Sequence, residues 1–182
     1  MNIAASGRTP AQDSASSSEY RAALSQAMED LAGDPRVVFL GQGVRDPGTF
    51  MSTTLQDVPL EQRIELPVME EAQLGMSIGL ALAGLVPVSI FPRWNFLILA
   101  ANQLVNHLDK MGAHVIVRVG VGSSRPLDPG PQHVGDFTEP FRAMMPNTNF
   151  TRIEHARDAG PAYRDALSRS GPSVIVEIAD LY

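Results

Sequence analysis

The sequence predicts an α/β fold in which a mostly parallel sheet is covered by helices on both faces. Short apolar runs rich in β-branched residues alternate along the chain with segments whose apolar residues recur at helical spacing. Because the run at residues 37–40 is apolar throughout, it is typical of a strand buried on both faces. Ligands bind beyond the carboxyl ends of the strands in such folds, so the loops that follow strands are the candidate functional segments.

The first element is expected to be a helix that starts near Ser18, which can cap it, and stops at Gly33. Residues 1–18 are rich in alanine, serine and polar groups and lack the apolar core of a signal peptide, so we expect a disordered tail there. Residues 19–182 then form one domain, which is long enough to bury a core of its own.

The remaining elements continue the alternation. Strands are predicted at residues 37–40, 64–66, 86–91, 114–119 and 173–178, and helices at residues 70–83, 96–110, 137–144 and 156–168. The loop over residues 120–135 is long for a compact domain, and long ordered loops are disproportionately functional. We therefore expect a second catalytic group in that loop.

The composition argues against several classes of ligand and active-site group. The formal net charge of -6 and the pI near 5.1, without a Lys/Arg cluster, argue against nucleic acid as a ligand. The absence of cysteine excludes a thiolate nucleophile and a cysteine-ligated metal, and it is compatible with the cytoplasm, where we expect the protein. The longest apolar stretch, residues 74–90, is too interrupted by glycine and proline to cross a membrane.

Glu70 and Glu71 directly follow a predicted strand and open an apolar, glycine-spaced helix. An acidic residue at a helix start is usually favourable only to the helix dipole, so this spacing alone does not assign a function. The residues that follow Glu71 are more specific. From Pro67 to Gln103 the sequence follows one uninterrupted pattern: a helix with small residues, and then a strand that ends in the aromatic-rich turn at residues 91–96.

This pattern resembles the beta subunits of the decarboxylating component of 2-oxoacid dehydrogenases. More widely it is similar to the transketolase-like pyrimidine domain of the thiamine diphosphate-binding fold. The run from Gly130 to His133 resembles the family's active-site histidine loop. The resemblance covers roughly residues 20–180.

The resemblance implies roles for four side chains. Glu70 is the glutamate that shares a proton with the aminopyrimidine ring of thiamine diphosphate and so activates the cofactor. Phe96 stacks on that ring, and Val68 is an apolar neighbour. His133 stabilises or protonates the oxyanion formed at the substrate carbonyl. By themselves, Phe96 equally suits a core position and His133 an exposed loop.

The family also needs a Gly-Asp-Gly motif and a later asparagine, which hold a divalent metal, Mg2+, and the diphosphate. Gly135 and Asp136 are followed by Phe137, so the motif is missing from this sequence. The resemblance therefore implies a second subunit that carries the motif, in a hetero-oligomer with two copies of each chain. A stripe of small residues every four positions, Gly75, Gly79 and Ala83, either packs within the domain or forms that interface.

We expect a split transketolase-like enzyme that transfers a two-carbon unit from a 2-oxo acid or ketose to an acceptor. The dehydrogenase beta subunits carry a further C-terminal domain that this sequence lacks. Gln42 and residues 144–147 also depart from their pattern, and these differences favour an aldehyde or keto-sugar acceptor over lipoamide. The alternatives are a 2-oxoacid dehydrogenase or decarboxylase subunit and, in another class, a non-catalytic scaffold or regulatory subunit.

Overall fold

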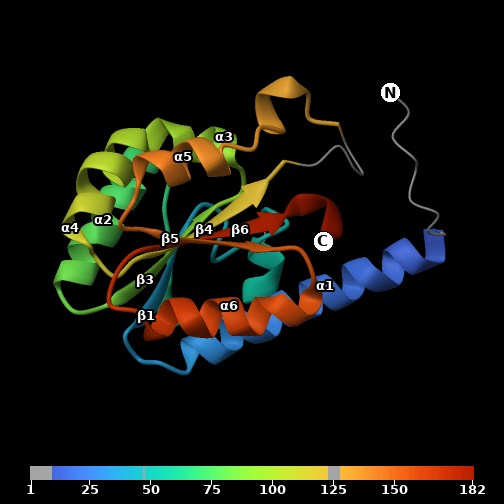
Figure 1. Ribbon diagram of the computed structural model, residues 1–182. Helices are drawn as coiled ribbons and strands as arrows, with labels where there is room; N and C mark the ends of the chain where they lie inside the picture. The colour runs from blue at the N-terminus through green and yellow to red at the C-terminus, as the bar shows by residue number, and fades with distance from the viewer. Residues whose placement is uncertain (1–9, 47, 123–127) are drawn as a thin grey trace.

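The computed structural model describes residues 10–46, 48–122 and 128–182, which form a parallel sheet between two layers of helices (Figure 1). The strands are β1 (Val37–Gly41), β2 (Arg63–Glu65), β3 (Val86–Phe91), β4 (Ile116–Val121), β5 (Asn149–Ile153) and β6 (Ser173–Ile178). The six strands lie in the order β2-β1-β3-β4-β6-β5, and each neighbouring pair is parallel. The predicted fold class is confirmed.

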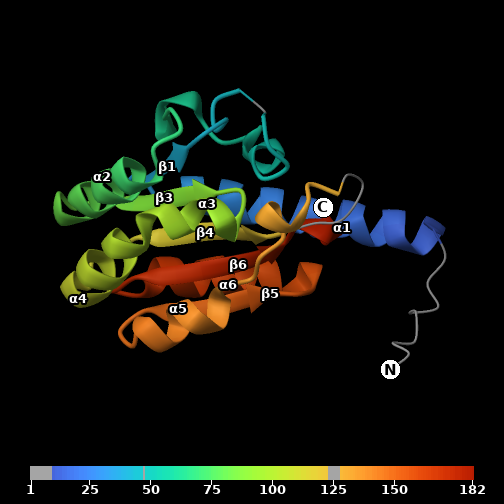
Figure 2. The same ribbon diagram turned by 90° about the horizontal axis from the view of Figure 1, so that it is seen from above.

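Helices cover both faces of the sheet, as Figure 2 shows from above. One layer consists of α1 (Pro10–Ala32) and α6 (Ala156–Ser168), and the other of α2 (Glu70–Leu82), α3 (Trp94–Leu97), α4 (Asp109–Met111) and α5 (Thr138–Met144). Each layer packs its own apolar cluster against the sheet. Every residue of β3 and β4 is buried, which explains why these strands are mostly apolar and do not alternate with polar residues. In the described part of the chain, no helix combines the length and the apolarity needed to cross a bilayer.

The first helix begins at Pro10 rather than near Ser18. Proline suits the first turn of a helix because its ring fixes φ and its missing N–H would have no partner there. The segment that follows contains alanine, a strong helix former, and no interior proline or glycine. The structure thus has a helix over residues 10–18, where we expected a disordered tail. Residues 1–9 lie outside the described residues, and the domain boundary stays a prediction.

Other differences concern the shorter elements. The strand β5 was not predicted, and β4 runs to Val121, two residues beyond the expected end at residue 119. The helix expected at residues 96–110 is a continuous helical segment that changes pitch from α3 through a 3-10 turn, η3 (Ile98–Ala100), and a π-helical stretch, η4 (Gln103–Leu108), to α4. The remaining 3-10 turns are η1 (Ser52–Leu55), η2 (Leu60–Gln62), η5 (Pro131–His133) and η6 (Ala179–Leu181).

A buried charged network joins the sheet to the loop that follows β1. The Arg118 Nε of β4 lies 2.8 Å from the Glu177 Oε1 of β6, and both side chains are fully buried. Tyr163 and Tyr182 donate hydrogen bonds to the same carboxylate. Burial raises the pKa of each tyrosine well above its usual value, so both remain protonated donors. Arg118 Nη1 also donates to Thr54 Oγ1 at 2.9 Å, which fixes η1 near the carboxyl edge of the sheet.

Candidate functional site

The strand order reverses between β1 and β3. The chain passes from β1 to its outer neighbour β2 and returns to β3 on the other side of β1. Ligands of open parallel sheets bind at such a switch point, beyond the carboxyl ends of the strands. Gly41 ends β1 with a φ of +155°, and a Cβ atom there would lie 2.7 Å from the carbonyl oxygen of Ile90. Only glycine allows this close approach.

Gln73 of α2 joins the two strands at the switch point. Its amide is buried and donates to Ser89 Oγ at 3.1 Å and to the Ile90 carbonyl oxygen at 2.9 Å, both in β3. The same amide reaches the Leu40 carbonyl oxygen of β1 at 3.4 Å. The amino end of α2 is therefore held against this crevice. Sequence reasoning missed Gln73, because a single glutamine within a helix carries no signal of its own.

Glu70 is the first residue of α2, one turn before Gln73. Its side chain is only 5% exposed, yet none of the described residues donates a hydrogen bond to its carboxyl group or forms an ion pair with it. Its carboxyl oxygens are not among the fully buried polar atoms that lack a partner, so they reach the surface. The carboxyl group is therefore available to a donor from outside the chain.

Phe96 and His133 lie together although they come from different loops. Phe96 belongs to α3, directly after β3, and His133 ends η5 in the long loop after β4, the neighbouring strand. Their ring centroids are 5.6 Å apart at an interplanar angle of 60°. The Nδ1 atom of His133 is buried and has no hydrogen-bond partner among the described residues. The structure thus brings together two of the residues that the sequence singled out.

The histidine segment is fastened to the turn after β3 by polar contacts. Arg93 Nη1 donates to the carbonyl oxygen of His133 at 2.9 Å, and the Gly135 amide donates to Asn95 Oδ1 at 3.1 Å. A Cβ atom at Gly122 would lie 2.2 Å from Val134 Cα, so the two sides of the loop pass close to each other. Arg93 and Asn95 were not singled out, although polar residues directly after a buried strand are a usable signal.

The apolar residues next to Glu70 in the sequence differ in exposure. Leu74 is buried, but Val68 is 73% exposed and Met69 is 46% exposed. Val68 is therefore placed on the surface, directly before α2. The described residues next to Glu70 in the sequence therefore leave this region open to another molecule.

The small residues of α2 lie on the exposed side of the helix. Gly75, Gly79 and Ala83 are all exposed, and no described atom lies within 4 Å of the place where a Cβ of either glycine would stand. Met76 and Leu82 on the same helix are 44% and 63% exposed. Close packing within the domain is therefore not the reason for the stripe. We call the exposed surface formed by Gly75, Met76, Gly79, Leu82 and Ala83 the α2 outer face.

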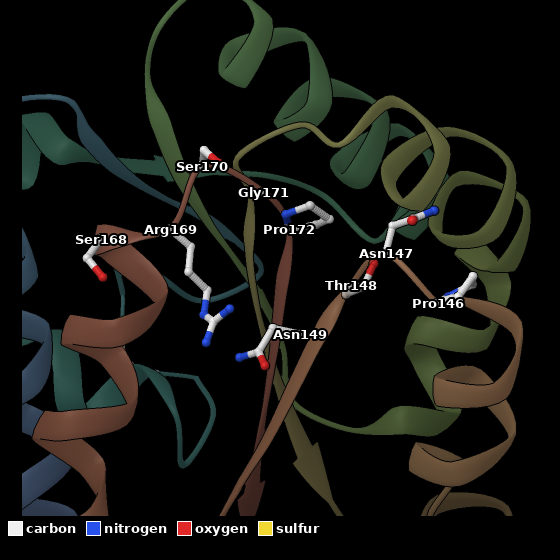
Figure 3. A pocket seen from close by; sticks show the side chains of 9 residues that line it. All are labelled: Pro146, Asn147, Thr148, Asn149, Ser168, Arg169, Ser170, Gly171 and Pro172. Carbon is white, nitrogen blue, oxygen red and sulfur yellow. The ribbon is translucent and has the colours of Figure 1, made fainter.

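A hollow of about 620 Å³ lies at the opposite edge of the sheet, around the amino ends of β5 and β6 (Figure 3). It is lined by residues 146–149 and 168–172, which are mostly polar. Its one arginine, Arg169, forms an ion pair with Asp165 at 2.7 Å. Because ligands of parallel sheets bind at the carboxyl ends of strands, this hollow is a weaker candidate for the functional site than the region of Glu70, Phe96 and His133.

Comparison with known proteins finds relatives that share this fold. A family model for the transketolase pyrimidine-binding domain matches residues 16–182. The mitochondrial pyruvate dehydrogenase E1 component subunit beta of Caenorhabditis elegans is 28% identical over 180 residues, which cover 92% of this chain and 50% of that protein. The corresponding subunit of Saccharomyces cerevisiae is 30% identical over 174 residues, covering 89% and 47%. The chain spans about half the length of these curated relatives.

Solved structures show the same fold at low sequence identity. A split-gene transketolase, described as an inactive beta4 tetramer, superposes with a TM-score of 0.68 at 16% identity, covering 88% of this chain and 50% of that chain. The transketolase of Leishmania mexicana gives a TM-score of 0.64 at 19% identity, covering 86% of this chain and 24% of that chain.

Proposed function

The chain belongs to the transketolase pyrimidine-binding domain family, and from that premise we propose that it is the pyrimidine-binding subunit of a split thiamine diphosphate-dependent enzyme. The observation that carries the proposal is the carboxyl group of Glu70, a residue that is only 5% exposed, which has no hydrogen-bond or ion-pair partner among the described residues and lies at the start of α2. An aminopyrimidine ring nitrogen is the kind of partner that this carboxyl group lacks.

The site residues fit the cofactor in chemical type. When bound, thiamine diphosphate supplies a nucleophilic carbon that attacks a substrate carbonyl. Glu70 holds a proton at the pyrimidine nitrogen, and Phe96 presents a phenyl face against which the ring can stack. His133, whose Nδ1 is buried without a partner among the described residues, holds or moves a proton at the carbonyl oxygen of the substrate. Val68 becomes an apolar neighbour of the cofactor once another chain covers it.

Replacing Phe96 with alanine is expected to weaken cofactor binding about tenfold, because a stacked ring pair contributes on the order of 1 kcal/mol beyond burial. The affinity is measured by titrating thiamine diphosphate into the complex with the partner subunit. Phe96→Leu serves as the control, since leucine keeps an apolar side chain and removes only the aromatic face. If both variants bind the cofactor as tightly as the wild type, Phe96 is a core residue and not a stacking platform.

We further propose that a partner subunit with a Gly-Asp-Gly motif holds Mg2+ and the diphosphate, in an assembly of two copies of each chain. The described residues include no cluster of three or more acidic or histidine side chains that could hold a metal ion. The α2 outer face supports a partner, because its open glycines permit another helix to approach closely and its exposed methionine and leucine provide apolar contact area. A cytoplasmic location stays a prediction.

Gly79→Leu is expected to weaken association with the partner by roughly 10- to 100-fold, because overpacking a close contact costs about 1–3 kcal/mol. The fold of the chain itself should be unaffected, since no described atom lies within 4 Å of that position. Gly171→Leu is a matched control, because Gly171 is equally free of neighbours but lies in the turn before β6 at the other edge of the sheet. Association is measured by sedimentation velocity, and equal loss in both variants would show that the α2 outer face is not the interface.

For the reaction, we propose transfer of a two-carbon unit from a 2-oxo acid or ketose to an aldehyde or keto-sugar. The second candidate is a 2-oxoacid dehydrogenase or decarboxylase subunit, which the relatives named as pyruvate dehydrogenase subunits favour. Co-purification of the partner, followed by product analysis with pyruvate, candidate aldehydes and lipoamide, separates these readings. Hydroxyketone products support the transferase, and acyl-lipoamide supports the dehydrogenase. No turnover by a cofactor-loaded complex would indicate a scaffold.

A further inference from the structure

Arg93 is a partly buried cation beside the candidate catalytic pair. It immediately precedes α3 in the turn after β3, and its Nη1 atom donates to the backbone carbonyl of His133 at 2.9 Å. The ring of the same histidine contacts Phe96, so the three residues form one cluster. Among the described residues, no carboxylate forms an ion pair with its guanidinium group.

Anchoring the loop does not account for a positive charge at this position. A backbone carbonyl needs one donor, which a neutral side chain can supply, and Asn95 already fastens the same segment at Gly135. A guanidinium carries five N–H donors, and within the described residues only one of them has a partner. Partial burial of a charge without a counter-ion is unfavourable unless an anion completes it. The chain as a whole has a net charge of -6, so the anion would have to be attracted by this local cation.

We infer that Arg93 binds the anionic end of the substrate, a carboxylate or a phosphate, in the reaction proposed above. The planar fork of the guanidinium matches the two oxygens of either group. Its attachment to the backbone of His133 sets the anion next to the histidine that holds the carbonyl oxygen. The class of substrate in this inference rests on the proposed function. That the ligand is an anion rests on the contacts of Arg93.

The test uses the complex of the chain with its partner subunit, carrying wild-type Arg93, Arg93→Gln or Arg93→Lys. Glutamine keeps a donor for the His133 carbonyl and removes the charge, whereas lysine keeps the charge. Kinetics are compared for pyruvate against butane-2,3-dione, and for fructose 6-phosphate against fructose, so that each anionic donor has a neutral counterpart. In Arg93→Gln we expect KM to rise at least about tenfold for one anionic donor, with little change for its neutral counterpart. Partial recovery is expected in Arg93→Lys.

The pair of donors that responds identifies the anion as a carboxylate or a phosphate. Arg142→Gln, on the exposed face of α5, is the matched control and should leave both KM values unchanged. An equal rise in KM for charged and neutral donors would show that Arg93 only anchors the loop, and it would overturn the inference.

Equilibrium dialysis with pyruvate and with fructose 6-phosphate measures binding without turnover. Binding to the wild-type complex that weakens at least about tenfold in Arg93→Gln supports the inference even if the complex converts neither compound, in which case only the proposed function fails. Equal binding by both forms, or no binding of either compound by the wild type, would overturn it.

Discussion

Glu70→Gln is expected to lower the rate of proton exchange at the C2 carbon of bound thiamine diphosphate by about 10²- to 10⁴-fold, the usual contribution of a positioned general acid or base. Glutamine keeps the size and shape of the side chain but cannot share a proton with the pyrimidine nitrogen as a carboxyl group does. Because the carboxyl group has no partner among the described residues, its replacement should break no contact within the fold. Exchange is followed by NMR after deuterium labelling of the complex with the partner subunit.

Glu71→Gln provides a close control. Glu71 is the next residue, belongs to the same first turn of α2 and is exposed, so its replacement changes the helix end by the same charge. We expect normal exchange in this variant and normal assembly in both. Unchanged exchange in Glu70→Gln would remove Glu70 from the catalytic role, whatever the behaviour of the control.

Arg118→Met is expected to lower the free energy of unfolding by about 3–5 kcal/mol, which is the cost of breaking a buried ion pair on one side. The Glu177 carboxylate would then remain fully buried with two tyrosine donors and no positive charge. Since domains are stable by only about 5–15 kcal/mol, this is a large share of the total. Urea unfolding of the purified protein measures the loss, with a thermal midpoint lowered by roughly 6–20 °C.

The exposed pair Arg142 and Glu139 on α5 is the control for this prediction. Its atoms are 3.2 Å apart with side chains 45% and 77% exposed, and Arg142→Met should change the stability by at most about 1 kcal/mol. Replacing both partners, as Arg118→Met with Glu177→Leu, should destabilise less than Arg118→Met alone, because no buried charge is left unpaired. A double variant that is less stable than the single one would show that the charges themselves do not dominate.

Apolar patterning was enough to predict most of the fold. The strands β1, β3 and β6 are mostly apolar runs, and the sequence predicted them almost to the residue. The strand β5 was missed because Asn149, Thr151 and Arg152 give it a polar side, as suits an edge strand that is partly exposed. The π-helical stretch η4 was missed because its apolar residues also satisfy the ordinary helical period.

The site was predictable only where a motif carried it. The register from Pro67 to Gln103 singled out Glu70 and Phe96, and the structure adds the contact between Phe96 and His133 that no spacing could predict. Gln73 and Arg93 owe their importance to neighbours on other strands and loops, which become adjacent only after folding. Arg118 did offer a signal, because a single charged residue within the apolar run of β4 requires a buried partner.

The α2 outer face also has a consequence for the life of the chain in the cell. Its open glycines and its exposed methionine and leucine leave newly made copies with an apolar surface that can associate nonspecifically until a partner covers it. Under the proposed two-subunit assembly, copies made in excess would meet one another, chaperones or proteases first, so the two subunits should accumulate in matched amounts. Balanced synthesis of the two subunits would then be required because this one helix exposes an apolar face.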